Sequence, residues 1–201
     1  MYLFTIGHSN YEINYFINIV KKYKINCIVD VRSIPYSKYS PQYNKENIKQ
    51  TLKNNKINYI YMGKEFGAMR TSKTLYTKEG YVDFEKVKYD KDFKLGINRV
   101  KVGVEKGYNI AFMCSEKNPT DCHRCILIGR NFKELGYNII NIIDENKYKL
   151  QNDIEKELIE TYYPDRNQIA LIPEMNLSNE ELINNVYKFK NREIGYRLSS
   201  K

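Results

Sequence analysis

Short apolar runs alternate along the chain with longer segments whose apolar residues recur every three or four positions. The runs are rich in β-branched residues and span residues 3–7, 25–31, 57–62, 108–114 and 137–143. Runs of this kind are typical of strands buried on both faces. The longer segments have the spacing of one helix face. They span residues 11–23, 46–54, 84–106 and 120–135.

Strands separated by helices of this length form βαβ units, which require a parallel sheet with right-handed crossovers. The pattern therefore predicts an α/β fold: a Rossmann-like three-layer sandwich with a mostly parallel sheet of about five strands and C-terminal helices. Two segments interrupt it. Residues 33–44 contain Pro35 and Pro41 and are expected to form a loop. Residues 63–81 show no clear period and are expected to form a long irregular loop, called the excursion below. Long loops inside compact domains are usually functional.

The pattern changes after about residue 148. Residues 150–162 and 178–190 predict two further helices, joined by a connector at residues 164–173. Ser178 is followed three residues later by Glu181, which is the spacing of a capping box. We therefore divide the chain into a Rossmann-like domain, residues 1–148, and a helical extension, residues 149–201.

Composition limits the class of protein. The chain has 201 residues, of which 42% are hydrophobic, and no apolar run reaches the roughly 18 residues of a membrane span. Its first residues carry no basic leader, so we expect a cytoplasmic protein without a membrane partner. Four cysteines in a chain of this length predict free thiols and not a disulfide scaffold. The oligomeric state is left open.

The chain is basic, with 33 Lys and Arg against 24 Asp and Glu and a net charge of +9. Such a balance is typical of proteins that bind nucleic acid. However, the lysines are scattered through a chain rich in Asn, Ile and Tyr. A solvated surface that reflects composition alone is the alternative interpretation.

Chemically active side chains gather where the predicted strands end. Ligands of open parallel sheets bind outside the carboxyl ends of the strands. Both histidines and three of the four cysteines follow strands one and four. The candidate residues are His8 and Ser9 after strand one, Asp30, Arg32 and Ser37 after strand two, and Cys114, Glu116, Cys122, His123 and Arg124 after strand four. We expect these residues to form one neighbourhood.

Three ordered motifs carry a family resemblance. They are Thr5-Ile6-Gly7-His8-Ser9; Asp30-Val31-Arg32 with Pro35, Ser37, Pro41 and Asn44; and Met113-Cys114-Ser115-Glu116 with Pro119 and Cys122-His123-Arg124. Over residues 3–145 the chain resembles the bacterial and archaeal family called domain of unknown function 488. The resemblance implies a Rossmann-like three-layer domain with these motifs at its site, and it implies no settled activity. The chain departs from the family at Phe66-Gly67-Ala68 and at Asn141, where a Leu-Gly-Gly turn and a histidine are usual.

Several candidates have two interpretations. His8 is a catalytic acid or base oriented by Asp30, or a structural histidine that fastens its loop. Arg32 binds a phosphate or carboxylate, or pairs internally with an acid. Glu116 is a general base or a ribose ligand, or it forms a salt bridge to the following helix.

The cysteines suggest nucleophilic chemistry. Thr120 is expected to cap a helix, which places Cys122 near its positive end and favours thiolate. Cys114 is expected to be a core residue or a ligand contact. Cys114, Cys122, His123 and Cys125 could bind zinc, but their spacing is unusual, and neighbours on a helix point about 100° apart. We therefore predict no metal site.

Three hypotheses of function follow. The first is an enzyme whose strand-end pocket binds an anionic, nucleotide-like or sugar-phosphate ligand through His8, Arg32, Glu116 and Arg124. The second is a thiol-based enzyme or redox sensor that uses Cys122. The third is a binding module for nucleic acid or protein without catalysis. The chain has neither a Gly-x-Gly-x-x-Gly motif nor a P-loop, so the usual nucleotide cofactors are not expected by those routes, and the cofactor is left open.

Overall fold

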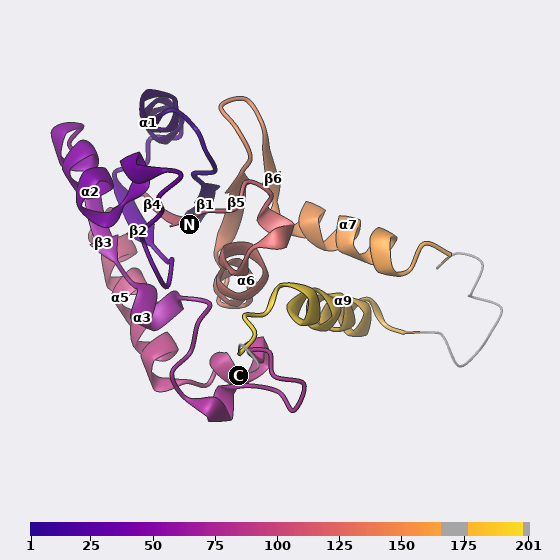
Figure 1. Ribbon diagram of the computed structural model, residues 1–201. Helices are drawn as coiled ribbons and strands as arrows, with labels where there is room; N and C mark the ends of the chain where they lie inside the picture. Colours follow the sequence, from indigo (N-terminus) through magenta and orange to yellow (C-terminus); the bar gives the residue numbers. More distant parts are fainter. Residues whose placement is uncertain (166–176, 199–201) are drawn as a thin grey trace.

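A six-stranded sheet in the order β3-β2-β4-β1-β5-β6 forms the centre of the molecule (Figure 1). The structure is a computed structural model that describes residues 1–165 and 177–198. The strands are β1 (Tyr2–Gly7), β2 (Cys27–Asp30), β3 (Asn58–Tyr61), β4 (Ile110–Cys114), β5 (Asn138–Ile142) and β6 (Tyr148–Leu150). All neighbours pair in parallel except β5 and β6. The prediction of about five strands missed β6, which is too short to show a period.

The strand order explains why the candidate residues meet. In the usual Rossmann order, 3-2-1-4-5-6, the first strand lies beside the second. Here β4 lies between β2 and β1. The mixed α/β fold with a mostly parallel sheet is confirmed, whereas the strand order differs from that of the Rossmann fold. The carboxyl ends of β2, β4 and β1 are consequently consecutive along one edge.

Helices cover both faces of the sheet. Helices α1 (Ile13–Lys22) and α2 (Lys45–Asn54) bury residues such as Phe16 and Leu52 against one face. Helices α5 (Lys91–Glu105), α6 (Arg130–Glu134), α7 (Gln151–Tyr162) and α9 (Asn179–Ile194) contribute to the core on the opposite face. Strand β4 serves both cores, because Met113 points to one face and Phe112 to the other.

The predicted helix at residues 84–106 is broken into two, and the two predicted loops contain short helical turns. The segment 84–106 forms α4 (Phe84–Val87) and α5, because the Asp90 side chain accepts hydrogen bonds from the amides of Asp92 and Phe93 and starts a second helix. The excursion at 63–81 contains α3 (Gly63–Phe66) and the short 3-10 turn η2 (Lys73–Leu75). A further 3-10 turn, η1 (Pro41–Tyr43), lies in the predicted proline loop.

The predicted helix start at Thr120 is wrong. Asn118 caps the 3-10 turn η3 (Pro119–Asp121) by accepting a hydrogen bond from the Thr120 amide. Cys122 then has an extended backbone (φ −139°, ψ 138°). The chain enters its helix only after Cys122, as the π-helical segment η4 (Arg124–Gly129) followed by α6. Turns of π-helix are rare in proteins, and those that occur are often found at functional sites.

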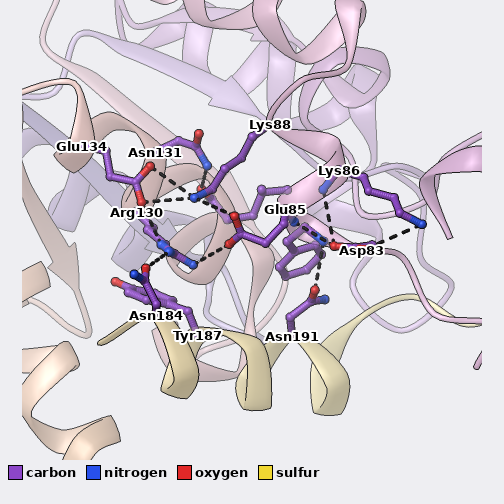
Figure 2. Close-up of polar contacts among 12 residues, drawn as sticks. Asp83, Glu85, Lys86, Lys88, Arg130, Asn131, Glu134, Asn184, Tyr187 and Asn191 are labelled. Atoms are coloured by element: carbon purple, nitrogen blue, oxygen red, sulfur yellow. Dashed lines mark hydrogen bonds and ion pairs between the residues drawn. The ribbon is translucent and has the colours of Figure 1, made fainter. Parts of the chain in front are cut away.

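The C-terminal helices pack into the main core. Helices α7 and α9 lie side by side (Figure 1), and α9 starts with the predicted Ser178–Glu181 capping box. Figure 2 shows Arg130 of α6 joined to Glu85 of α4 and Asn184 of α9. The predicted connector at 164–173 lies mostly outside the described residues, and the domain division at residue 148 stays a prediction. Among the described residues, no helix combines the length and apolarity that a membrane crossing needs.

Candidate functional site

The predicted site residues lie at one edge of the sheet, in two hydrogen-bonded groups. The Asp30 group comprises His8, Asp30, Arg32, Tyr43 and Tyr59. The Cys122 group comprises Cys114, Glu116, Cys122, His123 and Arg124. Backbone contacts join the groups: the His8 amide donates to the Cys114 carbonyl over 2.9 Å, and His123 Nε2 donates to the Val31 carbonyl over 3.1 Å.

Arg32 is engaged by partners within the protein. Its Nε and Nη2 atoms donate to the two carboxylate oxygens of Asp30 over 2.9 and 2.6 Å. Nη2 also donates to the Tyr43 carbonyl over 2.9 Å, and Nη1 contacts His8 Nε2 at 3.0 Å. Tyr59 adds a hydrogen bond to Asp30. A bidentate pair of this kind is strong, and it leaves Arg32 little capacity to bind a ligand.

His8 is held neutral. Because Arg32 is always a donor, His8 Nε2 must accept, and Nδ1 carries the proton that is donated to the Ser9 carbonyl at 2.7 Å. Burial and the adjacent Arg32 charge lower the pKa of His8 to about 4. The ring also stacks on Tyr43 with centroids 4.1 Å apart. Arg32 lies between His8 and Asp30, so the predicted orientation of His8 by Asp30 is not what the geometry shows.

The two predicted serines organise loops. Ser9 has a left-handed backbone (φ 48°), and its amide donates to the Ser115 carbonyl. The Ser37 hydroxyl accepts hydrogen bonds from the amides of Tyr39 and Ser40, and its own amide donates to Asn44. Both serines therefore shape the walls of the site.

Cys122 makes the central contacts of its group. Its sulfur lies 2.9 Å from Glu116 Oε2 and 3.7 Å from His123 Nδ1. Burial opposes a charge on Cys122, but a hydrogen bond from Cys114 and the charges of Arg124 and His123 outweigh it and lower the pKa of Cys122 well below its ordinary value. The hydrogen bond to Cys122 and burial raise the pKa of Cys114. Cys122 therefore favours the thiolate form, and Cys114 favours the thiol form.

Glu116 shares a proton with this centre. A carboxylate and a thiolate at 2.9 Å repel each other, so one of the two groups must keep a proton. Partial burial of its carboxyl group and the charge of Cys122 both raise the pKa of Glu116. The residue as a whole is exposed, and it connects the buried sulfur to solvent. Glu116 can therefore exchange a proton between Cys122 and the outside.

Arg124 is the other buried cation of the site, with 0% of its surface exposed. Its Nη2 atom donates to the Lys117 carbonyl over 3.0 Å. Its Nε and Nη1 atoms have no hydrogen-bond partner in the part of the chain that the structure describes. Arg124 also lies close to Gly7, where an added Cβ would be 3.1 Å from Nη2 and would collide with the Glu116 carbonyl. Glycine is therefore required at the end of β1.

Three side chains of the Cys122 group could hold a metal ion. The ligand atoms of Cys114, Cys122 and His123 lie within 4.8 Å of one another. The hydrogen bond from His123 Nε2 to the Val31 carbonyl is one that metal-bound histidines commonly make. Cys122 is extended and not helical, so its side chain and that of His123 are not held about 100° apart as neighbours on a helix would be. The prediction of no metal site stands as an expectation that metal analysis tests.

Tyr43 and Tyr59 lie outside the three sequence motifs but belong to the site in the folded protein. Tyr43 is fully buried, stacks on His8 and accepts from Arg32, while Tyr59 donates to Asp30 over 2.8 Å. The alternation of β3 could have placed Tyr59 beside β2, but no local signal marks Tyr43. Asn141 accepts a hydrogen bond from Thr5 and donates one to Gln151, so it connects β1, β5 and α7.

Fold and site together define a mixed α/β protein with a thiol, carboxylate and imidazole centre at the carboxyl edge of a mostly parallel sheet. A family model described as domain of unknown function DUF488 matches residues 12–130, more than half of the chain. The protein belongs to this family. No curated protein and no solved structure matches the chain.

Proposed function

We propose that the protein is a thiol-dependent enzyme or redox protein in which Cys122 is the reactive group. The contact of its sulfur with both Glu116 Oε2 and His123 Nδ1 is the observation that carries this proposal. Thiolate is the nucleophilic form of cysteine, and an adjacent imidazole is a common means of stabilising it. His123 is held for this role by its second nitrogen, which donates to the Val31 carbonyl.

The chemistry divides among four side chains. Cys122 supplies the sulfur nucleophile, and Arg124 and His123 stabilise its negative charge. Glu116 receives or returns the proton. Cys114, whose thiol is stabilised, lies close enough to form a disulfide with Cys122 when an external disulfide or peroxide accepts the two electrons and the two thiol protons.

An anion-binding site built on His8 and Arg32 is less well supported, because both side chains are occupied by internal partners. In that hypothesis Arg124 is the cation with donor capacity, since two of its nitrogens have no partner among the described residues. An anionic group on the substrate of Cys122 would supply the missing acceptor. The two hypotheses then describe one centre, with Arg124 binding and Cys122 reacting.

Alkylation by iodoacetamide at about pH 6, followed by peptide mass mapping, tests the proposal. All four cysteines are similarly buried, with exposed fractions of 0 to 4%, so differences in access are small. Burial raises the pKa of Cys27 to about 11 and that of Cys125 to about 12. We expect Cys122 to react at least about tenfold faster than the others, because thiolate is the attacking form even though its nucleophilicity falls with pKa.

The Cys122→Ser variant is the matched control and should remove the fast reaction while labelling of Cys27 stays the same. Uniform labelling, or faster labelling of Cys27, would overturn the proposal. Metal analysis of the purified protein is the second arm. One equivalent of zinc that is lost in Cys122→Ser would show a metal centre in place of a reactive thiol.

A further inference from the structure

A separate cavity of about 790 Å³ opens at the carboxyl ends of β2 and β3. Ser33, which follows β2, and Tyr61, the last residue of β3, form one wall. The segment at 69–75 and the start of α5 form the other walls. Crevices at this edge of a parallel sheet are the usual ligand sites, and the volume suits a nucleotide-sized molecule.

A buried arginine in the wall of the cavity is incompletely paired. Arg70 is only 8% exposed, and its Nη1 atom donates to the Glu65 carbonyl over 3.0 Å. Its guanidinium lies 5.9 Å from the centre of the Phe93 ring. Nε and Nη2 have no acceptor within residues 1–165 and 177–198. A buried cation whose acceptors are backbone carbonyls and not a carboxylate is costly, so Arg70 is suited to an external anion.

The acids of the cavity are already used. The Asp90 carboxylate accepts the amides of Asp92 and Phe93 at the start of α5. Asp92 pairs with Lys64 over 3.3 Å. Lys91, also in the lining, has no acidic partner in the described part of the chain. The charges of Asp90 and Asp92 also act on Arg70. The lining nevertheless has three cations, Lys64, Arg70 and Lys91, against these two acids, so one positive charge is left unbalanced.

We propose that this cavity binds a small anionic molecule whose phosphate or carboxylate group pairs with Arg70 and Lys91. Arginine can hold either group through two parallel hydrogen bonds, and burial strengthens the attraction. Ile34 and Met69 line the same cavity and are 64% and 38% exposed, so an apolar or planar part of the ligand would cover them. This site does not depend on thiol chemistry at Cys122.

Isothermal titration calorimetry at low salt tests the proposal with three probes that share one ring system: 1-naphthyl phosphate, 1-naphthoate and neutral 1-naphthol. We expect an anionic probe to bind at least about tenfold more tightly than 1-naphthol, since tenfold corresponds to about 1.4 kcal/mol. If 1-naphthyl phosphate binds more tightly than 1-naphthoate, the natural ligand carries a phosphate group; if 1-naphthoate binds more tightly, it carries a carboxylate. Equal affinity for the three probes, or no binding of either anion, would overturn the proposal.

Charge reversal at Lys91 locates the site. Lys91→Glu should weaken binding of the anions at least about tenfold and leave 1-naphthol unchanged. Lys101→Glu is the matched control, because Lys101 lies further along α5 and is not in the lining. Arg70→Lys should also weaken anion binding, because it removes the guanidinium that pairs with the anion. If that variant does not fold, the comparison of Lys91→Glu with Lys101→Glu decides whether the cavity is the site. Unchanged binding in Lys91→Glu would contradict the assignment.

The Cys122→Ser variant separates this inference from the proposed function. It should bind the naphthyl anions as the unmodified chain does, because the cavity is lined by other residues. Failure of anion binding with selective alkylation of Cys122 rejects only the cavity. Anion binding without selective alkylation of Cys122 rejects only the thiol proposal.

Discussion

Arg32 and Arg124 are buried at the same edge of the sheet, but their partners differ. Arg32 has a carboxylate, a carbonyl and an imidazole nitrogen as acceptors. Arg124 donates to the Lys117 carbonyl and lies against the Cys122 sulfur, and it has no carboxylate partner in the described part of the chain. The sequence predicts both arginines as anion ligands and does not distinguish them. A pattern of residue types does not show which acidic side chain will pair with which arginine in the folded chain.

The neutral state of His8 predicts a pH dependence of stability. The pKa of His8 falls from 6.5 to about 4 on folding, so the unfolded chain takes up this proton first as the pH decreases. Stability should therefore decline as the pH falls from about 6.5 to 4, with a contribution from His8 of up to about 3 kcal/mol. Urea denaturation near neutral pH and at about pH 4.5 measures the decline.

His8→Gln is the control for this prediction, because an amide oxygen can still accept from Arg32 but does not titrate. The variant should lose less stability than the unmodified protein over the same pH interval. The difference between the two curves isolates His8 from the carboxylates that also titrate on acidification. Parallel curves would show that His8 is not the source.

At the scale of elements, the sequence predicts well where a signal is local and strong. The five parallel strands and helices α1, α2 and α7 lie where apolar spacing predicts them, and the Ser178–Glu181 box starts α9. The predicted helix bounds are wrong at Asp90 and Asn118, where a side chain caps a new helical turn. Capping by these residues competes with continuous apolar spacing, and only the folded chain shows which of the two prevails.

Arg130 couples three helices, and its loss should weaken their packing. Its guanidinium donates to Glu85 of α4, Glu134 of α6 and Asn184 of α9 over 2.7 to 2.9 Å and covers the Tyr187 ring (Figure 2). Arg130 is buried but its acidic partners are partly exposed, so we expect Arg130→Met to cost about 2 kcal/mol of unfolding free energy. Urea denaturation measures this cost.

Arg192→Met is the comparison for Arg130. Arg192 pairs with Glu79 at 3.4 Å, and both side chains are more than half exposed. An exposed pair contributes about 0 to 1 kcal/mol, so this variant should be nearly as stable as the unmodified chain. Equal losses in the two variants would show that burial of Arg130 contributes nothing to stability.

At the scale of the whole molecule, topology assembles the site. Strands β1, β2 and β4 are far apart in sequence, and their carboxyl ends meet only because β4 inserts between the other two. The sequence could predict that these ends bear the polar residues, since each motif is contiguous. It could not predict Tyr43 as a stacking partner or Arg70 in a cavity, because both arise from long loops whose paths have no period.

Helices α7 and α9 contribute a large part of the main core. Leu182, Val186 and Tyr187 of α9 and Ile154 and Leu158 of α7 are buried in the same core as β4 and α5. Each large apolar side chain contributes about 1.5 to 3 kcal/mol when buried, so their sum is comparable with the 5 to 15 kcal/mol that typically stabilises a domain.

We therefore expect a fragment of residues 1–148 to lack a cooperative thermal transition by circular dichroism. Gln151 adds to this expectation, because its side chain hydrogen-bonds to Cys125 and Asn141 inside the core. Addition of a peptide of residues 149–201 is the control and should restore part of the transition. A fragment 1–148 that melts as the full chain does would instead support residues 1–148 as an independent domain, with α7 and α9 as an attachment to it.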